Sequence, residues 1–95
     1  MMTMKPAKDV PLVLSFDGEV LDVFRLSESV RVHIGLLDNL DLKTDKKGKH
    51  TLDINKAGGY TMQGILVDED AVARVTKLAA EVEKAKARFS FAGRA

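Results

Sequence analysis

The chain has 95 residues, of which 45% are hydrophobic and 31% charged, and its 15 Lys and Arg nearly balance its 14 Asp and Glu. This composition is typical of a folded domain, because it is too apolar for a disordered chain and too charged for a membrane protein, and the length allows a single hydrophobic core. The absence of cysteine excludes a disulfide framework, a thiolate nucleophile and a sulfur-ligated zinc site. We therefore expect a cytoplasmic protein, and the balanced charge indicates no class of partner.

The first residues, 1–9, are expected to form a flexible tail that precedes a single domain over residues 10–91. The Met-rich start is typical of a loose chain end. The N-terminal stretch lacks the apolar run of a signal peptide, and no segment approaches the roughly 20 apolar residues of a transmembrane helix. We therefore expect no membrane-spanning segment.

Apolar residues then recur at about every second position, which is the period of a β-strand. Two such runs, 11–16 and 19–26, flank the dipeptide Asp17-Gly18. Asp-Gly between two strand-like runs predicts a β-hairpin, because glycine adopts the positive φ that a type I′ turn requires. The domain is therefore predicted to begin with a tight hairpin.

Further strands are predicted over residues 30–36, 40–44, 49–55 and 60–67. In the first of them apolar and polar residues alternate, which predicts a buried face made of Val30, Val32, Ile34 and Leu36. The last three strands are joined by short turns rich in Gly, Lys and Asp. Because such short connections require antiparallel neighbours, these three strands are expected to form one continuous sheet.

The period changes at Asp68, which marks the start of a helix over about residues 68–89. Asp68 is predicted to be the N-cap, and Glu69 and Asp70 place negative charge at the positive end of the helix dipole. Apolar residues then follow at steps of three or four, at Ala71, Val75, Leu78, Val82, Ala85 and Phe89. This single stripe predicts an amphipathic helix that docks on the sheet.

These elements predict an α+β fold, an antiparallel meander of about six strands that forms a bent sheet or partly open barrel, capped by one C-terminal helix. Three segments show the same alternation and order as a known family: Arg31-Val-His-Ile-Gly-Leu-Leu-Asp-Asn-Leu-Asp-Leu42, Thr51-Leu-Asp-Ile54 and Gly64-Ile-Leu-Val-Asp-Glu-Asp-Ala-Val-Ala-Arg-Val75. Over about residues 12–89 the chain thus resembles the bacterial pleckstrin-homology-like (PH/GRAM-like) domains. That family usually has seven strands before the helix, so either one longer run is bent into two strands or the domain is a reduced version.

The resemblance implies a phosphoinositide site around the first hairpin, where such family members carry basic residues. Here five carboxylates and one arginine lie between Asp9 and Glu28, and the turn itself reads Asp17-Gly18-Glu19. Negative charge repels a phosphate headgroup, so phosphoinositide is not the expected partner.

A second hairpin is basic, and its candidate anion contacts are Lys43, Lys46, Lys47, Lys49 and His50. Clustered lysines bind nucleic-acid phosphate or an acidic membrane surface through counterion release. The alternative is a solvated hairpin tip whose charges discourage edge-to-edge aggregation. We favour this alternative, because no aromatic residue is interleaved to stack on bases, and nucleic acid is therefore not the expected partner.

No set of residues in the sequence indicates catalysis, a metal site or a cofactor. The two histidines have no carboxylates converging on them in the pattern, and Gly58, Gly59 and Gly64 lack the Lys-Ser/Thr that follows a phosphate-binding loop. We therefore expect a non-enzymatic module without metal or cofactor.

The strand over residues 30–36 is the candidate interface, with Arg31, Val32 and His33 as its interface residues. It contains no proline and shows no evident protection against pairing with another chain. A second copy or another protein would cover this edge by strand addition, whereas in a monomer the N-terminal tail would cover it. We therefore predict a protein-interaction or self-association module, with anion binding through the basic hairpin as the alternative.

Overall fold

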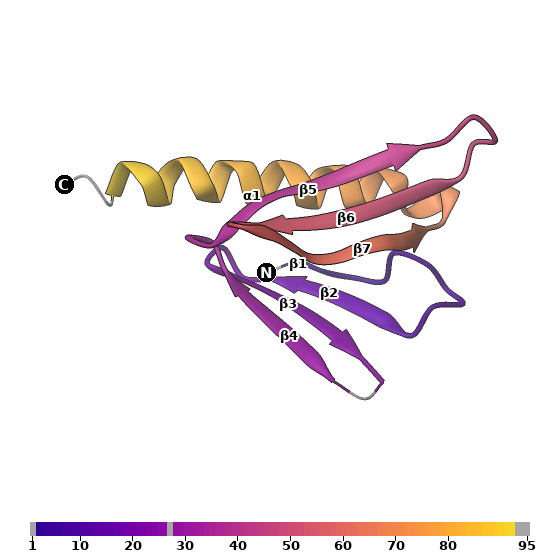
Figure 1. The fold of residues 1–95 in the computed structure, drawn as a ribbon, viewed down its shortest axis with the longest axis horizontal. Coiled ribbons are helices and arrows are strands. Elements are labelled where there is room, and N and C mark those ends of the chain that lie inside the picture. Colours follow the sequence, from indigo (N-terminus) through magenta and orange to yellow (C-terminus); the bar gives the residue numbers. More distant parts are fainter. Residues whose placement is uncertain (1, 27, 93–95) are drawn as a thin grey trace.

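The computed structural model describes residues 2–26 and 28–92, and for residues 90–92 the backbone alone. The described chain forms two antiparallel sheets and a long C-terminal helix (Figure 1). The first sheet contains, in spatial order, β1 (Met2–Met4), β2 (Leu12–Phe16), β3 (Val20–Arg25) and β4 (Ser29–His33). The second contains β5 (Leu37–Thr44), β6 (His50–Lys56) and β7 (Gly59–Val67). A 3₁₀ turn, η1 (Glu69–Ala71), leads into α1 (Val72–Ala92). The α+β class is confirmed, and the described strands do not close into a barrel.

Residues 2–9 belong to the fold, which corrects the expectation of a tail over residues 1–9; residue 1 lies outside the described residues. β1 pairs with β2, so that Met4 lies opposite Leu14 and is buried in the core. Farther along, the Pro6 carbonyl accepts the backbone N–H of Asp68 at 2.8 Å. With β1, the described chain has seven strands before the helix, one more than the six that were predicted, and none of the predicted runs is bent into two strands.

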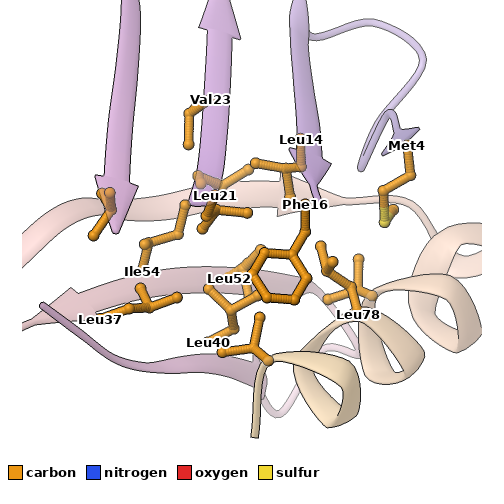
Figure 2. Close-up of a cluster of buried hydrophobic side chains, with 14 of the residues drawn as sticks. Met4, Leu14, Phe16, Leu21, Val23, Leu37, Leu40, Leu52, Ile54 and Leu78 are labelled. Atoms are coloured by element: carbon orange, nitrogen blue, oxygen red, sulfur yellow. The ribbon is translucent and has the colours of Figure 1, made fainter. Parts of the chain in front are cut away.

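The hydrophobic core lies between the inner faces of the two sheets and the inner face of α1 (Figure 2). Strand alternation places apolar side chains on these inner faces, as predicted. The largest fully buried side chains come from both sheets and the helix and include Leu14, Leu21, Val23, Leu52, Ile54, Val75, Leu78 and Val82. Their burial is the main stabilising contribution to a domain that has no disulfide.

Helix α1 docks through the predicted stripe, but it begins differently from the prediction. Val75, Leu78 and Val82 are all 0% exposed. Asp68 lies in an extended conformation before η1, and its side chain forms no cap hydrogen bond. Its carboxylate Oδ2 accepts the backbone N–H of Lys8 at 2.8 Å instead. Asp68 therefore fastens the N-terminal segment to the end of β7 rather than capping the helix.

The β2–β3 hairpin is confirmed, although its turn is not type I′. Only Gly18 has a positive φ here, at 101°, whereas a type I′ turn needs positive φ at both central residues. The Asp17 carboxylate accepts the backbone N–H groups of Val20 and Glu19, each at 2.8 Å. Both hydrogen bonds lower the pKa of Asp17, and the bond from Val20 has the larger effect. The turn therefore holds a negative charge in a fixed position.

The strand predicted over residues 30–36 is shorter in the structure, because β4 ends at His33. The backbone N–H of Leu36 bonds to the His33 carbonyl at 2.8 Å, and this turn directs the chain into the second sheet. Leu36 is therefore 59% exposed instead of buried. A Cβ at Gly35 would lie 3.1 Å from the Phe89 ring, so a larger residue here would require a small shift of the Phe89 side chain.

Strand β7, which in the described residues pairs with β6 alone, contains a β-bulge. The β6–β7 register shifts opposite Asp53, where β7 carries an extra residue. Gly64 has a φ of +69°, and its N–H donates to Asp53 Oδ1 at 2.9 Å. An added Cβ at Gly64 would meet no atom within 4 Å, so the backbone conformation, and not lack of space, requires glycine there.

Candidate functional site

Strand β4 is the edge of the first sheet, since in the described part of the chain it pairs with β3 alone. The ends of this ladder are hydrogen-bonded pairs, formed by Arg25 N–H with the Glu28 carbonyl and by Ile34 N–H with the Glu19 carbonyl. Bonded and non-bonded pairs alternate along an antiparallel ladder, so Ser29 and Arg31 occupy non-bonded pairs with β3. Their backbone N–H and C=O groups therefore point away from β3, toward the open edge.

Two of the three candidate interface residues have opposite orientations. Arg31 is exposed, and its Nε donates to Asp22 Oδ1 at 2.9 Å on the outer face of the sheet. The hydrogen bond and the charge of Asp22 raise the pKa of Arg31. Val32 points into the core and is only 5% exposed. The accessible groups of this strand are therefore the Arg31 side chain and the outward backbone, not the Val32 side chain.

The third candidate, His33, is exposed but contacts α1. Its Nδ1 accepts the backbone N–H of Gly35 at 2.9 Å. Its ring meets the Phe89 ring edge-on, with the centroids 5.4 Å apart and the planes at 72°. The part of the edge that lies away from the Phe89 contact therefore runs from Ser29 to Val32.

The basic hairpin does not present five available cations. Lys43 Nζ lies 2.8 Å from Asp53 Oδ2 and 3.8 Å from Asp41 Oδ2. The hydrogen bond from Lys43 is the largest cause that lowers the pKa of Asp53, and the Gly64 N–H adds to it. The same hydrogen bond raises the pKa of Lys43. Lys43 therefore neutralises a buried carboxylate on the outer face of the second sheet.

His50 is also engaged, in a row of three side chains. Its Nδ1 lies 2.7 Å from Thr44 Oγ1 and its Nε2 lies 2.5 Å from Glu69 Oε2. Hydroxyl, imidazole and carboxylate at these spacings resemble a catalytic triad. The Glu69 side chain is 87% exposed, however, and this row borders none of the hollows described below. We therefore interpret it as the contact that joins the second sheet to η1.

Three lysines remain at the hairpin tip, and all are exposed: Lys46, Lys47 and Lys49. The Asp45 carboxylate accepts the backbone N–H groups of Lys47 and Lys49, each at 2.9 Å. A negative charge is therefore held against the backbone of the tip and weakens the positive field of its lysines.

A hollow that the sequence did not reveal lies between the Leu12 and Arg25 ends of β2 and β3 and the strand β7. We call it the inter-sheet cleft; its volume is about 360 Å³, and it is lined by Val10, Leu12, Arg25, Met62, Gln63, Gly64, Ile65 and Leu66. A smaller hollow of about 230 Å³ shares Val10, Leu12 and Arg25 with it and extends to Leu26, which is 86% exposed. The cleft depends on how the two sheets meet, and no pattern in the sequence indicated it.

Protein-family models, curated proteins and solved structures give no match to this chain. Over residues 2–26 and 28–92, no helix has the length and apolarity needed to span a bilayer. Within the same residues, no three His, Asp or Glu side chains gather as potential metal ligands. The function is therefore inferred from the geometry of the chain itself.

Proposed function

We propose that this chain is a non-enzymatic self-association module of pleckstrin-homology-like fold, in which β4 pairs with β4 of a second copy. The observation that carries the proposal is the outward backbone of Ser29 and Arg31 at an unpaired sheet edge. Unpaired edge groups are a template for another strand, and proteins cover, charge or pair them. The PH-like assignment is supported by the seven strands before the helix, divided between sheets of four and three.

The register of the pairing follows from the side chains. When a strand is added at this edge, the residues whose backbone faces outward form hydrogen-bonded pairs with it. In a dimer with a two-fold axis, Ser29 of each copy would therefore pair with Arg31 of the other copy. Val30, which is half-buried against the core, would then face its symmetry mate and gain apolar contact. The register that places two Arg31 side chains opposite each other is disfavoured by like charge. A symmetric pair centred on Val30 is therefore the expected arrangement.

The test compares two substitutions at one position. Arg31→Pro removes an N–H that points away from β3, so it leaves the β3–β4 ladder intact while blocking the new one. Arg31→Ala removes the same ion pair with Asp22 but keeps the N–H. Light scattering over a concentration series should show association of the wild type and Arg31→Ala and a monomer for Arg31→Pro. Equal association of both variants would contradict the proposal.

The alternative, anion binding at the basic hairpin, has less support. Lys43 and His50 are held by Asp53 and Glu69, which leaves only the three tip lysines for an anionic partner. Titration with bulk RNA, DNA and acidic vesicles at several salt concentrations distinguishes the two functions, because binding through these lysines would weaken steeply with salt.

A further inference from the structure

The walls of the inter-sheet cleft come from both sheets, and most of them are apolar. On the first sheet Leu12 lies opposite Arg25 at the end of the β2–β3 ladder. On the second sheet Met62 and Ile65 flank the β7 bulge. A hollow of about 360 Å³, lined mainly by apolar residues together with Arg25 and Gln63, lies within the range of about 300 to 1,000 Å³ in which proteins bind small molecules.

Arg25 is the one charged residue among the described residues that line the cleft. It follows Leu21 and Val23 on the inward side of β3, so strand alternation directs its side chain to the mouth of the core. Its Nη1 donates to Glu28 Oε1 at 3.0 Å, and no described contact uses its Nε or Nη2. Both side chains of this pair are about half exposed, and exposed pairs of this kind contribute little to stability. The guanidinium therefore retains donors for a second carboxylate.

We propose that the inter-sheet cleft binds an aliphatic carboxylic acid, with its hydrocarbon chain between the sheets and its carboxylate on Arg25. The apolar walls would remove the chain from water, and the guanidinium would hold the carboxylate by charge-assisted hydrogen bonds at the mouth. A neutral ligand of the same length cannot form the charge-assisted hydrogen bonds with the guanidinium. The chemistry therefore selects a small anionic amphiphile over an alcohol or an alkane.

Decanoate is the probe, and decanol is its neutral match, both kept below the concentrations at which they aggregate. Titrations of the full chain are followed by the amide shifts of its NMR spectrum. We expect one decanoate per chain, with the largest shifts at Leu12, Met62 and Ile65, and binding at least about tenfold tighter than that of decanol. Within the series from hexanoate to decanoate, each methylene that enters the cleft should tighten binding by roughly three- to fourfold.

Two variants test the assigned atoms. Arg25→Gln should weaken decanoate by about tenfold or more and leave decanol unchanged, whereas Lys46→Gln, which removes the same charge at the distant hairpin tip, should change neither. Met62→Trp, which fills the cleft, should abolish binding of both probes while the circular dichroism spectrum shows an intact fold. Equal affinity of Arg25→Gln and the wild type for decanoate, or amide shifts confined to residues outside the cleft, would overturn the proposal.

Discussion

Truncation of Leu78 tests whether α1 completes the core. Its side chain is fully buried, at 0% exposure, on the face of α1 that meets both sheets (Figure 2). Leu78→Ala removes roughly three methylene equivalents, at about 0.8 kcal/mol each, and the cavity that remains adds a further cost, for a total of about 2 to 5 kcal/mol. Helix propensity cannot hide the effect, because Ala is at least as good a helix former as Leu.

The measurement is the free energy of unfolding in urea, followed by far-ultraviolet circular dichroism. A domain of this length has a stability of about 5 to 14 kcal/mol, so the loss should lower the melting temperature by roughly 10 to 30 °C. Lys77→Ala is the matched control: Lys77 directly precedes Leu78 and is exposed, so its substitution should have little effect on the free energy of unfolding. Leu78→Met, which conserves volume, should cost less than about 1.5 kcal/mol and remains measurable if the alanine variant is unfolded. A loss below about 0.5 kcal/mol for Leu78→Ala would refute the docking of the helix.

Three further predictions concern polar groups. The pKa of Asp53 is lowered from its ordinary value of 3.8, so its contribution to stability is present above about pH 4 and is lost as the pH falls through the lower, folded-state pKa. Asp53→Asn should therefore be less stable than the wild type near neutral pH and approach it in acid, and a difference independent of pH would show that the ion pair with Lys43 is not formed. Thr61 Oγ1 is buried without a hydrogen-bond partner in the described residues, so Thr61→Val should raise the free energy of unfolding by about 0.5 to 2 kcal/mol; a loss of stability would reveal a partner for the hydroxyl. Replacing Lys46, Lys47 and Lys49 together by Gln should change stability by no more than about 0.5 kcal/mol and leave self-association unaltered, and loss of association would place the interface on the hairpin instead of on β4.

The local elements of this fold could be predicted from the sequence because their signals are local. Alternation of apolar residues identified β2 to β7, and the stripe from Ala71 to Phe89 identified the helix. Strand β1 was missed, because three residues carry too little periodicity to separate a short strand from a loose end. Only the pairing with β2 shows that Met4 belongs to the core.

The errors at Asp68 and Leu36 have one cause, which is that tertiary contacts override a local preference. An Asp before an apolar stripe is a good N-cap, but here its carboxylate binds the backbone of Lys8, sixty residues away. Leu36 continues the alternation of its strand, but the turn from His33 rotates it to the surface. Neither partner can be identified from the residues that surround the position.

The candidate site was predictable in part. The strand was predicted to be an edge because it contains no proline and shows no protection against pairing, and in the described residues β4 does pair with β3 alone. The contact of His33 with Phe89 and the ion pair of Lys43 with Asp53 depend on contacts between different elements. The inter-sheet cleft depends on the angle between two sheets, which no local pattern in the sequence encodes.

The most direct test of the proposed function is the solution mass of three proteins, the wild type, Arg31→Ala and Arg31→Pro, measured by light scattering up to high micromolar concentration. If β4 pairs with β4, the masses of the wild type and Arg31→Ala rise toward that of a dimer, while Arg31→Pro remains a folded monomer because it lacks the outward N–H. A wild type that keeps the monomer mass over the whole range would contradict self-association through this edge.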